Sequence, residues 1–133
     1  MPVAVSLPSR LLKSRSEQGV LVLTVTEPHL RGDVLVTALR EELLAAVSGA
    51  PAPRVVLDFR LVTVLCSEGF RPLISLRRRI QELGGRLVLC HLGPVVAQVF
   101  QATRMVSTSR SSTAAFDVQP DLRAALASLS DAA

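Results

Sequence analysis

Aromatic side chains are scarce in this sequence. It contains four phenylalanines and neither tyrosine nor tryptophan, although hydrophobic residues make up 49% of its 133 residues. The core must therefore be built mainly from leucine, valine and alanine, a composition that suits helices packed on a sheet. With so few rings, the chain also lacks the aromatic stacking platform that binders of single-stranded nucleic acids use.

Cysteine is just as scarce. Cys66 and Cys90 are the only two, and neither belongs to a CxxC pair, which argues against a usual zinc site and against a disulfide framework. No run approaches the roughly 18 apolar residues of a membrane span, and the amino terminus lacks the pattern of a signal peptide. No glycine-rich phosphate loop is present. We therefore expect a cytoplasmic protein without a membrane segment, metal or cofactor.

Acidic residues are outnumbered by basic ones. There are 11 of the former and 15 of the latter, which gives a net charge of +4, and every basic residue except Lys13 is an arginine. Such a balance permits an anionic partner but does not require one. Charged residues make up 20% of a chain whose length is typical of one domain, so it is expected to fold as a single unit.

Short apolar runs alternate with amphipathic segments along the chain. The expected strands are 10–15, 20–25, 55–57, 86–90 and 116–118, and the expected helices are 35–47, 70–83, 94–100 and 120–129. This order predicts an α/β sandwich, a mixed sheet of about 4–6 strands with about four helices packed against it. Residues 10–131 form the expected domain, after a loose or edge segment at residues 1–9.

The stretch RVVLDFRLVTVLCSEG, residues 54–69, is the centre of this pattern. A buried strand ends at Asp58, and a small polar cluster, Cys66 to Gly69, precedes the next helix. Strand, loop and helix in this order place side chains and free N–H groups at the carboxyl edge of a sheet. We expect Asp58 and Gly69 to be structural, and Ser67 and Asp33 to cap the helices that follow them.

These features resemble the STAS domain, the fold of bacterial anti-sigma factor antagonists. The resemblance is tightest from Val55 to Phe100: a strand ending in Asp-hydrophobic, a small polar cluster before Gly-hydrophobic, then ELGG, RLVLC and a helix that begins with proline and ends in phenylalanine. It implies a non-enzymatic protein–protein interaction module in partner-switching signalling, which regulates transcription. The implied partner is an anti-sigma factor kinase or another STAS-containing protein.

In that family the second serine of the polar cluster is phosphorylated by the kinase, which breaks the complex between them. The resemblance places Glu68 at this position, with Cys66 and Ser67 before it and Gly69 after it. A glutamate there carries a fixed negative charge, so it could imitate the phosphorylated state and remove phosphoregulation at that position. Alternatively, Glu68 is an ordinary residue of a first helical turn, where the helix dipole favours a carboxylate.

Other hypotheses use other residues. Arg71, Ser75 and Arg78 are expected on an exposed helix face that could meet a partner protein or, as a minor alternative, a nucleic acid. Cys66 and His91 could form the thiolate–imidazole pair of an enzyme, a minor alternative because no orienting third group is evident. Within binding modules, the alternative is a scaffold subunit of a larger STAS assembly. The sequence leaves homodimer formation open, and His29 is expected in a loop.

Overall fold

A mixed sheet organises the computed structural model, which describes residues 11–49, 51–102, 106–107 and 116–130. Its strands are β1 (Leu12–Glu17), β2 (Val20–Val25), β4 (Arg54–Asp58), β6 (Arg86–Cys90), β7 (Val106–Ser107) and β8 (Phe116–Gln119). They lie in the order β1-β2-β4-β6-β8-β7, with β1 antiparallel to β2 and all other neighbours parallel. The predicted α/β sandwich is therefore confirmed. The expected segment at residues 1–9 lies outside the described residues.

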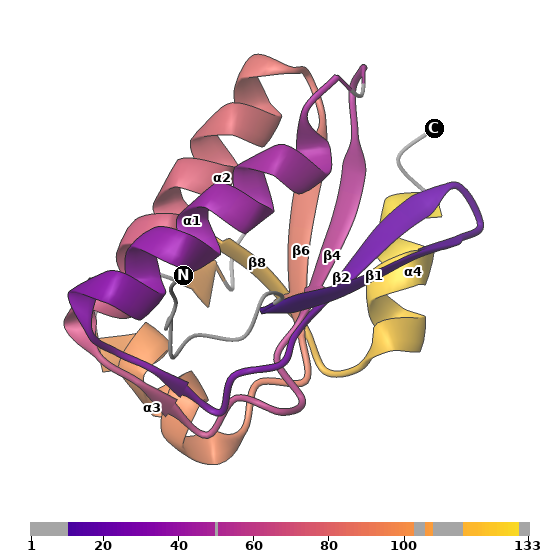
Figure 1. The fold of residues 1–133 in the computed structure, drawn as a ribbon. Coiled ribbons are helices and arrows are strands. Elements are labelled where there is room, and N and C mark those ends of the chain that lie inside the picture. Colours follow the sequence, from indigo (N-terminus) through magenta and orange to yellow (C-terminus); the bar gives the residue numbers. More distant parts are fainter. Residues whose placement is uncertain (1–10, 50, 103–105, 108–115, 131–133) are drawn as a thin grey trace.

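Helices cover both faces of this sheet (Figure 1). They are α1 (Asp33–Val47), α2 (Phe70–Glu82), α3 (Pro94–Ala102) and α4 (Leu122–Ser130). The helices α1 and α2 pack on one face and α4 on the other, while α3 lies below the sheet in the view of Figure 1. None of the helices in the described ranges is long and apolar enough to cross a membrane.

The strands β2, β4 and β6 send alternate side chains to two separate cores. In β4, Val55 and Leu57 belong to the larger core beneath α1 and α2, whereas Val56 belongs to the smaller core beneath α4. The carboxyl end of α4 is also held by side chains from the sheet. Arg54 and Arg86 donate hydrogen bonds of 3.3 and 3.2 Å to the carbonyl oxygens of Leu129 and Ser128, in the last turn of α4.

All four phenylalanines of the chain meet in one cluster in the larger core. The rings of Phe59, Phe70 and Phe116 each pack edge-on against Phe100, with centroids 6.2, 5.0 and 5.8 Å away. Such pairs contribute about 0.5–1.5 kcal/mol each beyond the area that they bury. The cluster joins the end of β4, the first residue of α2, the body of α3 and the first residue of β8.

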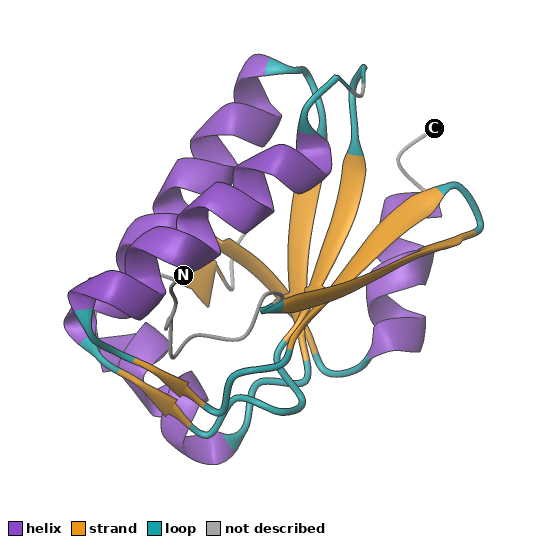
Figure 2. Ribbon diagram, in the orientation of Figure 1, coloured by secondary structure: helices purple, strands orange, loops and turns teal. Residues whose placement is uncertain are grey.

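A second, two-stranded sheet was not predicted from the sequence. It pairs β3 (His29–Leu30) with β5 (Val64–Leu65) in parallel, so the expectation that His29 lies in a loop is wrong. Two-residue strands are too short to show the alternation by which strands are recognised. Figure 2 shows this small sheet at the end of the molecule where the carboxyl ends of the main strands run into loops.

Neither helix start is capped as expected. Asp33 is the first residue of α1, Gly32 takes the N-cap position at φ 89°, and no side chain caps the helix there. Ser67 begins a 3-10 helix, η1 (Ser67–Gly69), which leads directly into α2. This irregular start keeps Pro72 within the first turn of α2, where its missing N–H is tolerated.

Gly69 is required by close packing and not by its backbone conformation. Its φ of −66° and ψ of −16° are helical, so any residue could adopt them. A Cβ atom at this position would lie 2.5 Å from Leu65 Cδ1 and 2.8 Å from the carbonyl oxygen of Leu30. The absent side chain therefore lets η1 pack directly against the small sheet, as expected for a structural glycine.

Replacing Gly69 with alanine should destabilise the protein through this contact. We expect the free energy of unfolding to fall by about 1–3 kcal/mol, the usual cost of overpacking, measured by urea denaturation followed by circular dichroism. Ser67→Ala is the matched control, because this exposed neighbour should change stability by no more than about 0.5 kcal/mol. Equal stability of Gly69→Ala and wild type would contradict the structural role.

The two cysteines should differ sharply in reactivity. Both thiols are free, and Cys66 is partly exposed whereas Cys90 is fully buried. Burial, assisted by the nearby Asp58 carboxylate, raises the pKa of the Cys90 thiol to about 12, so almost no reactive thiolate forms at pH 8. We expect Ellman's reagent to modify one thiol, that of Cys66, quickly in the native protein. After denaturation, in the presence of a chelator and the absence of reductant, it should modify two. The assignment would be contradicted if both thiols of the native protein reacted equally fast, or if native Cys66→Ser still showed the fast reaction.

Candidate functional site

The amino termini of α1 and of η1 lie side by side, and hydrogen bonds hold the segments that precede them. The N–H groups of Thr63 and Val64 donate to the carbonyl oxygen of Pro28 at 2.8 and 3.0 Å. The N–H of Cys66 donates to the carbonyl oxygen of Leu30 at 3.1 Å. These bonds continue the β3–β5 pairing up to the polar cluster, so the cluster reaches the start of α1.

Glu68 joins the two helix starts. Its Oε2 atom accepts a 3.0 Å hydrogen bond from the N–H of Gly32, the N-cap residue of α1. This bond, with that from its own backbone N–H and the attraction of Arg71 and Arg31, lowers the pKa of the Glu68 carboxyl below its usual value. The side chain is therefore ionised at neutral pH. Its negative charge lies at the partially positive amino terminus of α1, although Glu68 itself belongs to η1.

The rest of the polar cluster divides into exposed and packed residues. Ser67 is exposed and Cys66 is partly exposed, whereas Gly69 is buried against Leu30 and Leu65. Of the four residues predicted for this site, Ser67 and Glu68 therefore present the polar side chains that a partner could contact. Gly69 contributes by allowing the close approach of the backbone.

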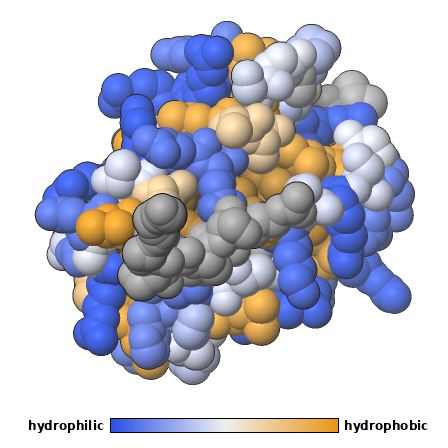
Figure 3. All heavy atoms as spheres, viewed as in Figure 1, coloured by the Kyte–Doolittle hydropathy of each residue, from blue (hydrophilic) through white to orange (hydrophobic). Residues whose placement is uncertain are grey.

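The expected face of α2 is shared with α1. Arg71 Nη1 lies 3.8 Å from Asp33 Oδ1, an exposed pair that contributes little to stability. Ser75 is half-buried and not exposed as expected, and its hydroxyl oxygen accepts a 3.2 Å hydrogen bond from Arg40 Nε. Arg78 is exposed as expected. Figure 3 shows hydrophilic side chains over much of this side of the molecule, with hydrophobic areas between them.

Cys66 and His91 are not brought together as a catalytic pair. Among the described residues, the thiol beside His91 is that of Cys90. These two residues form a group with Asp58, and Cys66 is not part of it. The Nε2 atom of His91 accepts a 3.3 Å hydrogen bond from the N–H of Leu122, the first residue of α4. The raised pKa of Cys90 keeps that thiol protonated, so this group is no ready nucleophile either.

Sequence reasoning missed the contribution of α1 to this site. Gly32, Asp33 and Arg40 all contact residues of the predicted cluster or of α2. The missing signal was the β3–β5 pairing, which brings two segments together that lie more than thirty residues apart (His29 pairs with Val64). No spacing rule within one segment could have revealed it.

Comparison with known proteins identifies the family. The family model described as "Mlab, STAS domain" matches residues 14–107. BtrV of Bordetella bronchiseptica, assigned as an anti-sigma factor antagonist, is 35% identical over 69 residues. These residues are 52% of this chain and 59% of that protein, so the match spans little more than half of the curated relative.

Solved structures agree on the fold. An anti-sigma factor antagonist (STAS) domain protein from Planctomyces limnophilus superimposes with a TM-score of 0.73 at 22% identity, over 90% of this chain and 97% of its own. RsbS from Moorella thermoacetica, in a variant with glutamate in place of a serine, gives 0.69 at 21% identity, over 91% and 96%. The family model covers most of the chain, and the chain belongs to the STAS domain family.

Proposed function

We propose that this protein is a non-enzymatic interaction module of the partner-switching kind, and that Glu68 gives its binding surface a fixed negative charge. The surface comprises Ser67 and Glu68 on η1, and Arg71 and Arg78 on α2. The proposed partner is an anti-sigma factor kinase or a protein derived from one, within the cytoplasm. The similarity to BtrV, assigned as an anti-sigma factor antagonist, supports this choice of partner.

The hydrogen bond between Glu68 and Gly32 carries the proposal. A glutamate that served only the dipole of its own first turn would not need to reach the N-cap residue of another helix. A phosphoserine at this position would bring about −1.5 to −2 charge and strong acceptor oxygens to the same N–H group. Glu68 supplies the same sign of charge permanently, which supports its comparison with the phosphorylated state.

The outer side of α1 extends the proposed surface. A shallow hollow there is lined by Asp33, Val34, Thr37, Ala38 and Glu41. Val34 is 71% exposed and forms an apolar part of this hollow, between the carboxyl groups of Asp33 and Glu41 in the sequence of α1. Apolar side chains framed by charges are typical of surfaces that bind proteins transiently. The hollow therefore supports a partner that contacts α1 and α2 together.

Exchanging Glu68 should reveal what its charge does. We expect Glu68→Ser to become phosphorylated by a matching kinase from the same cell with ATP, while wild type and the isosteric control Glu68→Gln are not. Both variants should bind that kinase roughly tenfold more tightly than wild type. The reason is that the kinase surface which disfavours a phosphorylated partner should also repel the fixed carboxylate of Glu68. Mass spectrometry measures the modification and calorimetry the affinity.

Two results would contradict the proposal in different ways. Efficient phosphorylation of wild type on Ser67 would show that the site is still regulated and that Glu68 is no permanent mimic. If no variant binds any candidate kinase, the role of Glu68 as an imitation phosphate is wrong. The partner is then to be sought among other STAS-containing proteins, as for a scaffold subunit.

The position of the surface can be tested by charge reversal. Arg78→Glu should weaken binding of the partner roughly tenfold, since Arg78 is exposed on the proposed face and a basic patch favours an acidic partner. Arg123→Glu is the matched control, because Arg123 is exposed on α4, which covers the opposite face of the sheet. Equal effects of the two substitutions would show that net charge matters and the proposed surface does not.

A further inference from the structure

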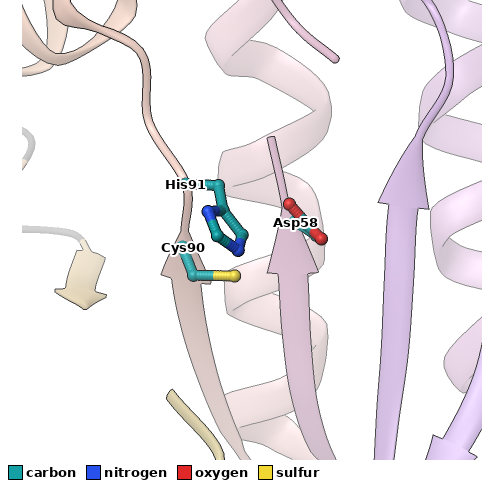
Figure 4. A group of neighbouring side chains, drawn as sticks. All are labelled: Asp58, Cys90 and His91. Carbon is teal, nitrogen blue, oxygen red and sulfur yellow. The ribbon is translucent and has the colours of Figure 1, made fainter. Parts of the chain in front are cut away.

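Three side chains with metal-binding atoms converge at the carboxyl ends of two neighbouring strands. Asp58 is the last residue of β4 and is paired in register with Cys90, the last residue of β6, and His91 follows directly. One ligand atom from each residue, a carboxylate oxygen, the sulfur and a ring nitrogen, lies within 4.8 Å of the other two. Figure 4 shows the three side chains pointing toward one another between the strands.

The backbone at His91 explains why two consecutive residues reach the same place. Successive side chains of a strand point to opposite faces, so the ring of His91 would normally point away from the thiol of Cys90. His91 instead has a φ of 58°, in the left-handed region that few residues other than glycine adopt. This turn ends the alternation and brings the imidazole beside the sulfur and the carboxylate.

The set of donors matches a borderline-soft divalent cation. Zn²⁺ takes thiolate, imidazole and carboxylate ligands, often three from the protein with solvent in the fourth position. Ligand atoms around a tetrahedral zinc ion lie roughly 3.3–3.8 Å apart, given bond lengths of about 2.0–2.3 Å. Small side-chain rotations within a group already inside 4.8 Å would produce this geometry.

A second layer of contacts already orients the carboxylate. Asp58 Oδ2 accepts a 3.0 Å bond from Arg60 Nε, and its Oδ1 accepts a 2.9 Å bond from the Arg60 N–H. Each carboxylate oxygen has a further lone pair available. Partners of this kind hold the ligands of metal sites in place. Arg60 is exposed and His91 is half-buried, so the group lies close to the surface although Asp58 and Cys90 are buried.

We propose that Asp58, Cys90 and His91 form a binding site for Zn²⁺ or a cation of similar chemistry. The thiol of Cys90 loses its proton to solvent as the sulfur–zinc bond forms, and no electron is transferred. If the ion binds His91 Nε2, it displaces the hydrogen bond from Leu122, which at 3.3 Å is a long one. The sequence predicted no metal because Asp58 lies far along the chain from Cys90 and His91, and the three residues follow no CxxC spacing.

The chain offers its own matched controls, since it has two cysteines and two histidines. Purified protein, stripped with a chelator, is titrated with Zn²⁺ by calorimetry and with Co²⁺ by absorption spectroscopy. We expect one ion per chain, release of a proton, a thiolate-to-cobalt charge-transfer band, and a rise in Tm with added Zn²⁺. Cys90→Ser and His91→Ala should weaken zinc binding by roughly 100-fold or more. Loss of a residue that only hydrogen-bonds a ligand already costs about 10–100-fold, and loss of a ligand itself should cost more.

Cys66→Ser and His29→Ala should bind Zn²⁺ as wild type does. The wild-type cobalt spectrum decides the matter even if Cys90→Ser fails to fold, because the charge-transfer band requires a thiolate ligand. A wild-type protein without that band, or one whose zinc affinity His91→Ala leaves unchanged, would overturn the proposal. The three residues would then serve only to support Arg60 and the start of α4.

Discussion

The contact between residues 28–30 and 63–69 is the constraint on which the candidate site depends. Hydrogen bonds of the small sheet join these segments, and Gly69 lets η1 lie against Leu30 without a side chain between them. Because α1 and α2 begin shortly after the two segments, their amino termini must lie together. Two positive helix ends in one place favour a carboxylate, and Glu68 provides it.

The aromatic cluster in the larger core holds the start of α2 in this position. Phe70, at the start of α2, packs on Phe100 of α3, which also touches Phe59 and Phe116. The four rings therefore link the beginning of α2 to strands on either side of β6. All four aromatic residues of the chain therefore pack together beside the first residue of α2.

The sequence was sufficient for the sandwich and for the identity of its main elements. The apolar run at residues 20–25, the buried run ending at Asp58 and the spacing of apolar residues in α2 are local signals, and the structure contains the elements that they predict. The bond between Glu68 and Gly32, the bond between Arg40 and Ser75, and the proximity of Cys90 to His91 and Asp58 are different. They depend on tertiary contacts and on one left-handed residue, and no periodicity encodes these.

The attachment of α4 divides the molecule unequally. Among the described helices, α4 alone covers its face, through Ala125, Leu126 and Leu129, with Arg54 and Arg86 at its end. The larger core, with α1, α2 and the small sheet, lies wholly on the other side of the strands. The sheet thus separates two cores of different size, and only the larger one lies beneath α1 and α2. A change of packing beneath α4 would therefore have to act through the sheet to reach the surface around Glu68.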